Sequence, residues 1–544
     1  MFRLHICRRA LEGDVKMGIY VNPGNQAFER VLPYSYVDMT GLIRLMNVRV
    51  GGSESLVCIS RPRGFGKSYA AKMLTAYYDC SCDSHALFDK KMISRTKAYE
   101  EHLNKYNVIS LDIGSFLFEA KCLHRPLGEV PQMIVEDLRK DLKRVYPNLP
   151  TRRTLNEELL CAVEEPGGKP FIFIIDEWDA MIREAKDDEA AQMSYLNLLR
   201  GWFKNSSFTP KVVAAAYMTG ILPIKKDGSQ SAISDFQEYS MLYPGEFAKF
   251  TGFSEKQVKQ LCKKNRIDFE SVKAWYDGYE LAGEYAIYNP YSVMSACREK
   301  TCRSFWNTTS AAEAMTDYIN MNFDGLQETV VQLIGGAEIE VSVDQFQNDF
   351  EHFETKDDVL TLLVHLGYLT YDTVHKTVHV PNEEVRDEFR HFLCKFQPGS
   401  QWSRLLGRSR KLLSDTLQKN GEAVAAALEE IREEDYAPQF YNNEQSLRAV
   451  IKYAYIAAFG QYVKVEEMPS GKGIADVVFI PTPLSRLPAM IVELKWNSTA
   501  GGAISQIKDK KYTSNLKPFA GQILLVGINY DEKTGKHTCL IETA

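Results

Sequence analysis

A lysine and a serine close a short glycine-rich turn, Arg-Pro-Arg-Gly-Phe-Gly-Lys-Ser, at residues 61–68. The two glycines would let backbone N–H groups curl around an anion, and a helix beginning at Lys67 would add its positive end. Lys67 would then reach the β- and γ-phosphates of ATP, and the Ser68 hydroxyl would hold Mg²⁺. Arg61 stands where the pattern G-x-x-x-x-G-K-[ST] has its first glycine, so the pattern is degenerate at that position.

Asp176 and Glu177 directly follow the apolar run Phe171–Ile175. Such a short run is typical of a buried parallel strand, and in ATPases this strand lies beside the phosphate loop. Asp176 would orient the Mg²⁺ shell, and Glu177 would polarise the attacking water. Both motifs have plainer interpretations, because G-K-S also arises by chance and an acidic pair also stabilises the dipole of a following helix.

A second set of chemical groups lies near the C-terminus, where Asp476 precedes Glu493 and Lys495. Alternation along residues 489–496 puts Glu493 and Lys495 on one face of a strand, and a hairpin would bring Asp476 against them. The two carboxylates would hold one or two Mg²⁺ ions for phosphodiester cleavage, and Lys495 would orient or help to deprotonate the attacking water. Taken alone, Glu-x-Lys is more often a solvated salt bridge.

The elements that must position the first set alternate between strands and helices. We expect strands at 56–60, 108–113, 171–175 and 211–220, and a helix through residues 69–77. This order predicts an α/β fold, a P-loop NTPase parallel sheet with helices on both faces. Thr219 ends its strand where such sheets bind ligands, so it would sense the γ-phosphate or be an ordinary strand-end threonine.

Composition narrows the class of protein. A length of 544 residues allows two to four domains, and 45% hydrophobic with 25% charged residues is typical of a globular protein. A net charge of -6 gives no overall basic signature, so a nucleic-acid surface would have to be a local patch. The eleven cysteines include no Cys-x-x-Cys pair, which favours reduced thiols in a cytoplasmic protein. No apolar run approaches membrane-spanning length, so we expect no membrane partner.

Six motifs together resemble the bacterial AAA-ATPase-like family, in the family's order, from about Met17 to the C-terminus. In that family an Arg-Pro-Arg opening replaces the first glycine of the phosphate loop. The resemblance therefore implies an ATP site that includes Arg61, Arg63, Gly64, Phe65 and Gly66 in addition to Lys67, Ser68, Asp176 and Thr219. The motifs are residues 61–68, 175–179, 217–224, 252–254, 275–279 and 288–292.

Family members commonly carry a C-terminal PD-(D/E)XK nuclease domain, and the second set of groups resembles that superfamily. A leading helix with Glu444 comes first, then Asp476, the Glu493-Leu494-Lys495 triplet, and Gln506 with Tyr512 on the helix beyond. The resemblance implies that Gln506 is a site residue, and that Glu444 is a further metal ligand beside Asp476 and Glu493. It also implies a restriction-endonuclease-like α/β domain that uses Mg²⁺, with Mn²⁺ as the alternative.

The domain plan that follows has four parts: an N-terminal extension at 1–16, an ATPase domain at 17–240, a helical lid with a winged-helix-like region at 241–400, and a nuclease-like domain at 401–544. Ser254 and Gln257 form a capping box that opens the first lid helix. In the ATPase part, Asp38 and Thr40 predict the cap of a helix that would lie against the nucleotide base.

These features favour a nucleotide-controlled nuclease acting on nucleic acid, DNA rather than RNA, in defence or DNA processing. The alternative is a switch-type ATPase that controls partner binding and carries a non-catalytic nuclease-like domain. A remodelling ATPase that works as a ring is a third reading, for which Arg183 and Arg200 are the candidate arginine fingers. The sequence leaves homo-oligomerisation, strandedness and the trigger open.

Overall fold

The structure is a computed structural model. It divides into two compact units: the first contains residues 1–302 and 340–378, and the second contains residues 303–339 and 379–544. The ranges that it describes are 17–33, 36–224, 233–281, 285–306, 319, 325–334, 336–343, 346, 353, 355–393, 401–435, 447–448, 451, 454–458, 461–470, 473–481, 485, 487–513, 516 and 523–544.

The first unit is built around a five-stranded sheet with the order β2-β3-β4-β1-β5. All of its pairings are parallel, so the strands end at the same edge. β1 and β3 are buried along their whole length, as expected for strands covered on both faces. The bounds are β1 Leu56–Ser60, β2 Asn107–Asp112, β3 Phe171–Asp176, β4 Val213–Gly220 and β5 Gln237–Tyr239.

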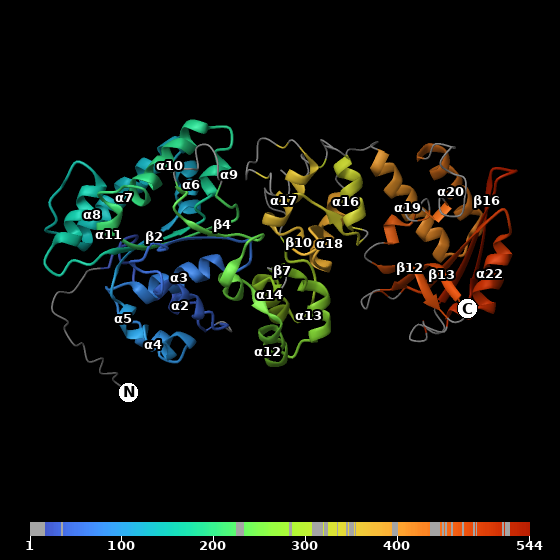
Figure 1. Cartoon of the computed structure of the whole chain (residues 1–544), viewed down its shortest axis with the longest axis horizontal. Coiled ribbons are helices and arrows are strands. Elements are labelled where there is room, and N and C mark those ends of the chain that lie inside the picture. The colour runs from blue at the N-terminus through green and yellow to red at the C-terminus, as the bar shows by residue number, and fades with distance from the viewer. Residues whose placement is uncertain are drawn as a thin grey trace. The chain divides into compact units, whose positions relative to one another are not determined.

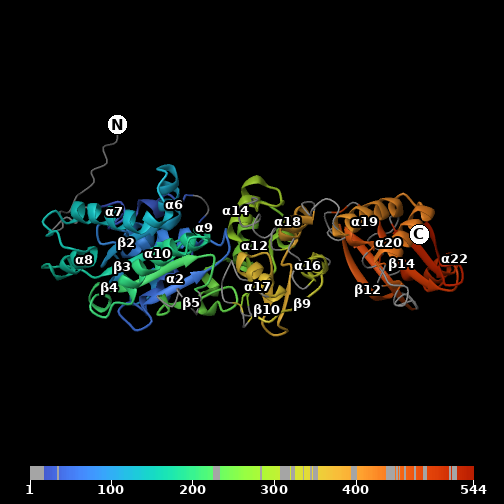
Figure 2. The same cartoon turned by 90° about the horizontal axis from the view of Figure 1, so that it is seen from above.

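Helices cover both faces of this sheet, as Figure 1 shows and Figure 2 shows from above. One hydrophobic core lies under α6–α11 and the other under α1–α5. The fold class expected from the sequence is therefore confirmed. The bounds are α1 Gln26–Glu29, α2 Gly41–Asn47, α3 Lys67–Tyr78, α4 His85–Phe88, α5 Tyr99–His102, α6 Ile113–Cys122, α7 Val130–Val145, α8 Leu155–Glu164, α9 Ala180–Glu184, α10 Glu189–Phe203 and α11 Thr209–Val212.

Two local details differ from the sequence prediction. The Thr40 side chain does not cap α2; instead the Asp38 carboxylate accepts hydrogen bonds from the Thr40 amide and hydroxyl, at 3.0 and 2.6 Å. β4 begins at Val213 rather than at Lys211, because Pro210 supports the short helix α11 directly before it. Neither difference moves the strand ends that carry the candidate site.

A smaller part of the first unit follows β5. A sheet with the order β6-β8-β7 packs with helices α12, α13 and α14. Ser254 and Gln257 form the expected capping box at the start of α12. The bounds are β6 Phe253–Ser254, α12 Glu255–Asn265, α13 Phe269–Tyr276, β7 Tyr279–Leu281, β8 Tyr285–Tyr288 and α14 Pro290–Glu299, followed later by α17 Lys356–Leu366 and β10 Thr370–Asp372.

In the segment expected to be winged-helix-like, α17, β10, β11 and α18 follow one another along the chain. His375 is exposed, and its ring contacts Asp372 at 2.6 Å. β9 (Ile339–Glu340), β11 (Thr377–His379) and α18 (Glu383–Leu393) complete this region.

The second unit contains a mixed five-stranded sheet with the order β12-β13-β14-β15-β16. Only the β14–β15 pair is parallel. α22 packs on this sheet over a core that includes Ile491 and Ile507. The bounds are α16 Leu326–Ile334, α19 Gln401–Leu417, α20 Gly421–Asp435, β12 Tyr462–Ser470, β13 Gly473–Pro481, β14 Ala489–Trp496, α22 Ala500–Asp509, β15 Ile523–Asp531 and β16 Lys536–Thr543.

Candidate ATP and nuclease sites

The glycine-rich turn connects the end of β1 to the start of α3. Gly64 and Gly66 both have φ +83°, a left-handed conformation that only glycine adopts at little cost. Apart from its chain neighbours, a Cβ atom added at Gly66 would meet no atom of the described residues within 4 Å, so the turn is open on that side. This strand–turn–helix geometry is the one by which backbone amides and a helix N-terminus hold a phosphate.

Lys67 lies inside the turn that it closes. Its Nζ donates to the carbonyl oxygens of Arg61 at 2.8 Å and Pro62 at 2.9 Å. Burial lowers the pKa of Lys67 to about 8, and the nearby carboxylate of Asp176 acts in the opposite direction. Because a phosphate oxygen is a stronger acceptor for an ammonium than a carbonyl is, the same side chain can turn to a nucleotide.

The carboxyl ends of three neighbouring strands line up beside the turn. Asp176 on β3 is in register with Asp112 on β2 and with Thr219 on β4. Burial raises the pKa of Asp176, while the Ser68 hydroxyl and the Lys67 ammonium counteract this shift. The Thr219 hydroxyl is fully buried and has no hydrogen-bond partner among the described residues. Asp176 therefore belongs to the strand, and the interpretation of it as a helix-capping acid does not hold.

Glu177 turns sharply away from β3. Its φ is +51°, and its amide donates to the Asp176 carboxylate at 3.1 Å. A Cβ atom on Gly114 would lie 2.7 Å from Glu177 Oε2, so the missing side chain at Gly114 makes room for this carboxylate beside α6. The carboxylate is about half exposed and lies 3.7 Å from Arg183. It can therefore still reach a water molecule.

The Arg61 side chain is fully buried, so it is not positioned at the surface where a ligand would arrive. Its guanidinium donates to the Thr251 hydroxyl at 2.9 Å, and to the Ser60 and Tyr239 carbonyl oxygens at 2.8 Å each. Burial lowers the pKa of Arg61 to about 10. In this structure the Arg61 side chain secures the turn. Arg63, which follows Pro62 in the turn, is exposed.

Asp179 is a buried residue of the 175–179 motif to which the sequence assigned no role. Its Oδ2 accepts the backbone amides of Ile221 at 3.1 Å and Leu222 at 2.9 Å, directly after β4. Arg183 also donates to this oxygen, at 3.0 Å. The arginine-finger candidate Arg183 is thus paired within its own chain, and Asp179 fixes the strand exit next to Thr219.

The second set of groups comes together on β13 and β14. These strands form the expected antiparallel hairpin, in which Val477 pairs with Val492. Asp476 is buried, and its Oδ2 accepts the Leu494 amide at 2.8 Å. The hairpin therefore brings Asp476 to the strand segment that carries Glu493.

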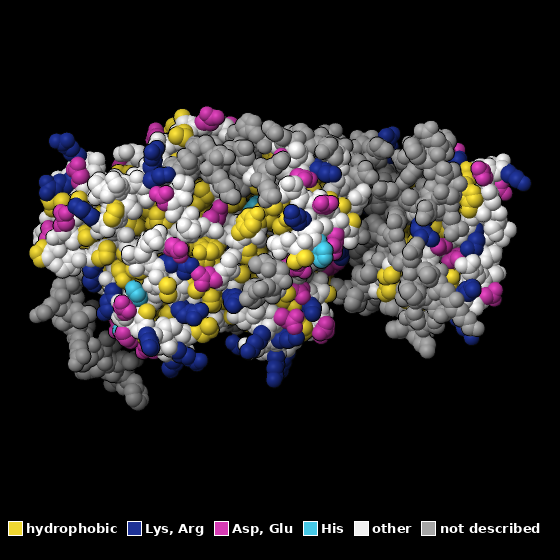
Figure 3. Space-filling model, viewed as in Figure 1, with side chains coloured by type: hydrophobic (Ala, Val, Ile, Leu, Met, Phe, Trp, Pro, Cys, Tyr) yellow, Lys and Arg dark blue, Asp and Glu magenta, His cyan; other side chains and the backbone are white. Residues whose placement is uncertain are grey.

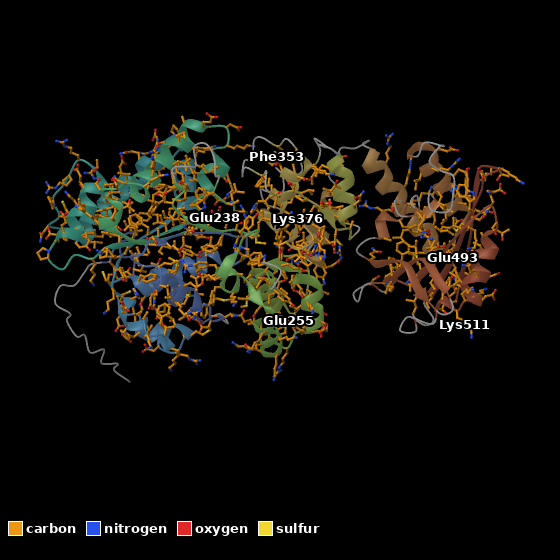
Figure 4. All side chains as sticks on the ribbon, viewed as in Figure 1. Glu238, Glu255, Phe353, Lys376, Glu493 and Lys511 are labelled. Carbon is orange, nitrogen blue, oxygen red and sulfur yellow. The ribbon has the colours of Figure 1, made fainter. Side chains whose placement is uncertain are left out.

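Glu493, labelled in Figure 4, is almost completely buried, at 1% exposure. Its Oε1 accepts hydrogen bonds from Lys495 Nζ at 3.1 Å and from the Gln506 amide of α22. Its Oε2 has no partner among the described residues. Burial, and next the charge of Asp476, raise the pKa of Glu493 to about 7. The salt bridge to Lys495 is thus a buried one, not the solvated pair that Glu-x-Lys usually forms.

Gln506 and Arg448 complete the surroundings of the two carboxylates. The Gln506 amide also donates to the Tyr512 hydroxyl at 3.2 Å, which holds it in place. Arg448 donates to Asp476 Oδ1 at 2.6 Å, a contact that the sequence did not indicate. Glu444, the predicted further metal ligand, lies outside the described residues.

The donor set can be compared with the needs of a divalent cation. No group of three or more His, Cys, Asp or Glu side chains that could hold a metal ion occurs in the described ranges. Asp476 and Glu493 supply two carboxylates, and Mg²⁺ commonly uses one or two while it keeps several waters. Within the described part of the chain Oε2 of Glu493 has no partner and is the donor still open, so these residues fit such an ion.

Fold and geometry together define a P-loop NTPase-type unit and a mixed-sheet domain with a carboxylate–lysine site. Comparison with known families agrees. The family model described as "Predicted AAA-ATPase" matches residues 24–229, and the PD-(D/E)XK nuclease superfamily matches residues 442–539. The resemblance drawn from the sequence is confirmed for both segments. The two matches support an ATPase or nucleotide-binding function together with a nuclease.

Two individual proteins are similar to this chain. The "Uncharacterized protein in vnfD 5'region" of Azotobacter chroococcum mcd 1 is 22% identical over 528 residues, which is 93% of this chain and 95% of that protein. A solved structure of the Aeropyrum pernix ORC2 protein, in ADPNP–ADP complexes, is 11% identical with a TM-score of 0.30. It covers 67% of this chain and 97% of that one, a likeness too low to support an argument.

The surface adds little to the choice of partner. On the face drawn in Figure 3, basic and acidic side chains are mixed. Among the described helices, none combines the length and the apolar character needed to span a membrane.

Proposed function

We propose that this chain is an ATP-hydrolysing protein whose nucleotide state controls a metal-dependent nuclease. Its substrate is nucleic acid, DNA in preference to RNA, and its setting is defence or DNA processing in the cytoplasm of a bacterium. The two family matches support the combination of domains. Homo-oligomerisation is part of this proposal.

In the ATPase part, each residue has a role that its position supports. Lys67 and the glycine turn bind the phosphates, while Ser68 and Asp176 hold the Mg²⁺ that accompanies ATP. Glu177 is half exposed and orients the attacking water. The Thr219 hydroxyl at the strand end is buried and has no partner among the described residues, which supports a contact with the γ-phosphate.

In the nuclease part, Asp476 and Glu493 hold Mg²⁺ or Mn²⁺, with Glu444 as a further ligand. The bound ion would supply charge stabilisation to the phosphodiester transition state. Lys495 lies 3.1 Å from the Glu493 carboxylate, so its ammonium is placed to orient the attacking water next to that ligand. Gln506 fixes the orientation of Glu493 through the amide contact to Oε1.

The observation that carries the nuclease proposal is the state of Glu493. A carboxylate oxygen that is buried and lacks a partner is costly, and a second carboxylate nearby increases the cost. A divalent cation would relieve both. If the nuclease-like domain served a structural role alone, an apolar residue in place of Glu493 would make it more stable.

The second candidate is the switch-type ATPase with a non-catalytic nuclease-like domain. One observation favours it: both oxygens of Asp476 already have partners, Arg448 at 2.6 Å and the Leu494 amide at 2.8 Å. A carboxylate neutralised by a guanidinium can serve structure alone. Of the two arginine-finger candidates of the ring-type remodelling ATPase, Arg183 pairs with Asp179 and Glu177 in its own chain, which disfavours it, and Arg200 is exposed.

The experiment measures cleavage of DNA and RNA with Mg²⁺ or Mn²⁺, with and without ATP, by the intact chain and by Lys495→Ala and Lys67→Ala. Two surface variants serve as controls, Lys419→Ala in the second unit and Lys72→Ala on the exposed face of α3. Loss of cleavage in Lys495→Ala, together with a changed ATP response in Lys67→Ala, supports the proposal. ATP binding without any metal-dependent cleavage would leave the switch-type ATPase.

A further inference from the structure

The glycine-rich turn of the ATP site is held from outside by the cap of α14. Asn289 is the N-cap residue of this helix and is 1% exposed. Its Oδ1 accepts the Tyr291 amide at 2.9 Å, while its Nδ2 donates to the Arg63 carbonyl at 3.1 Å. One side-chain amide therefore caps the helix and holds the turn at the same time.

The contact between α14 and the turn is close. The Tyr291 amide also donates to the Gly64 carbonyl, at 3.1 Å. A Cβ atom on Gly64 would lie 2.5 Å from Asn289 Oδ1 and 3.0 Å from Tyr291 Cβ, so only glycine fits between them. The conformation of Gly64 and the position of the α14 cap thus depend on each other.

Two further contacts tie neighbouring turn residues to segments that follow β5. The Phe65 ring packs edge-on against Tyr279 with 5.2 Å between centroids, and the Tyr279 hydroxyl donates to the Gly367 carbonyl at 2.9 Å. The Arg61 guanidinium reaches the Thr251 hydroxyl. The turn is therefore embedded in the later part of this unit.

We propose that Asn289 is a positioning residue for nucleotide binding: it holds the Arg63 carbonyl outward and caps the helix whose Tyr291 amide holds the Gly64 carbonyl, so that the amides of the turn face the phosphates. This inference rests on the proposed ATP binding. It also makes α14 responsive to the nucleotide. ATP binding and the capping of α14 share the contact of Asn289, so each must change the free energy of the other by the same amount. ATP binding should then steady the cap of α14.

Asparagine suits this role because its side chain both accepts and donates. Serine in its place would keep the acceptor for the helix cap, since serine is a good N-cap residue, but would lose the donor to Arg63. Aspartate would keep the size and the cap, and would place a carboxylate oxygen against the Arg63 carbonyl. Asn289→Ser and Asn289→Asp thus separate the helix cap from the contact with the turn.

The test measures the affinity for a fluorescent ATP analogue by anisotropy, in the full chain and in Asn289→Ser. Loss of the buried donor should weaken binding by about tenfold. The matched control is Asp268→Ala, because Asp268 is exposed and caps the preceding helix, α13, by accepting the Ser271 amide at 2.7 Å. This control should bind the analogue within about twofold of the unaltered chain.

A second readout follows hydrogen exchange of the peptide spanning residues 288–296, with and without ATP. In the unaltered chain ATP should slow this exchange, and Asn289→Ser should abolish the effect. The melting temperature of Asn289→Ser should stay close to that of the unaltered chain. If Asn289→Ser does not fold, Asn289→Asp takes its place in both measurements. Unaltered binding in a folded Asn289 variant, or unaltered exchange on adding ATP, would overturn the inference. An unaltered chain that binds no analogue would instead refute the proposed ATP binding.

Discussion

The Nζ atom of Lys67 lies 2.8 Å from the carbonyl oxygen of Arg61, the residue that replaces the first glycine of the phosphate-loop pattern. The Lys67 ammonium therefore bonds to a carbonyl oxygen of the turn that it belongs to. Burial lowers the pKa of this ammonium to about 8. The charge that would attract a triphosphate is thus present below pH 8 and is lost as the pH rises above it.

The first prediction is a pH dependence of ATP affinity. The affinity should fall as the pH rises from about 8 to about 10, because the neutral amine donates more weakly to phosphate. ATP is itself fully ionised in this range. Lys67→Met, which has no ammonium, should bind more weakly and show no such fall. Titration of a fluorescent ATP analogue across this range measures both, and equal slopes for the two proteins would contradict the assignment.

The second prediction concerns the stability of the nuclease-like domain. The pKa of Glu493 is about 7, above its ordinary value of 4.5. The folded protein then keeps a proton that the unfolded chain loses, so the contribution of Glu493 to the free energy of unfolding is full below pH 4.5 and disappears as the pH rises through 7. A cation that binds the carboxylate should restore stability above pH 7.

Thermal unfolding of the unaltered chain and of Glu493→Gln, from about pH 5 to about pH 9, tests this prediction. Without metal, the melting temperature of the unaltered chain should fall relative to the variant as the pH passes 7. Mn²⁺ should then raise the melting temperature of the unaltered chain above pH 7 and leave that of the variant in place. A Mn²⁺ effect of equal size in both proteins would place the ion elsewhere.

The third prediction is that Arg448 competes with the metal ion for Asp476. Its guanidinium lies 2.6 Å from Oδ1, the oxygen that the Leu494 amide leaves available. Removing this positive charge in Arg448→Gln should strengthen Mn²⁺ binding by about fivefold or more. Calorimetric titration with Mn²⁺ measures the change, and Arg404→Gln on the exposed side of α19 is the matched control. Unchanged or weaker Mn²⁺ binding in a folded Arg448→Gln would show that Arg448 only supports the structure.

Much of the fold could be predicted because its signals are local. The apolar runs that end at Ser60 and Asp176 became β1 and β3, and the capping box at Ser254 opens α12. Alternation in 489–496 also placed Glu493 and Lys495 on one face, where the structure has them in contact. In each case, neighbouring residues of the chain alone determine the element.

The contacts that hold the two sites were not predictable in the same way. Asn289 meets Arg63 across 226 residues of sequence, and Arg448 meets Asp476 from a separate segment. No periodicity or spacing encodes such a pair, since either partner could satisfy its polar groups locally. The motif at residues 288–292 was recognised through the family resemblance. Its contact with the glycine-rich turn could be recognised only from the position of Gly64 in the structure.

The last prediction separates the two glycines of the turn, which share a φ of +83° but not their surroundings. Alanine at either position should cost about 1–2 kcal/mol for the left-handed backbone. At Gly64 the new Cβ would also collide with Asn289 at 2.5 Å, whereas at Gly66 the described residues beyond the chain neighbours offer no atom within 4 Å. Gly64→Ala should therefore lower the melting temperature further than Gly66→Ala.

ATP affinity should rank the same variants differently. The Cβ of Gly66→Ala would point into the open side of the turn, where a phosphate would lie, so binding should be lost although the protein is only slightly destabilised. In Gly64→Ala, the added Asn289→Ser should recover part of the melting temperature, because the smaller side chain relieves the collision. A Gly66→Ala protein as unstable as Gly64→Ala, or one that binds ATP normally, would contradict this account of the turn.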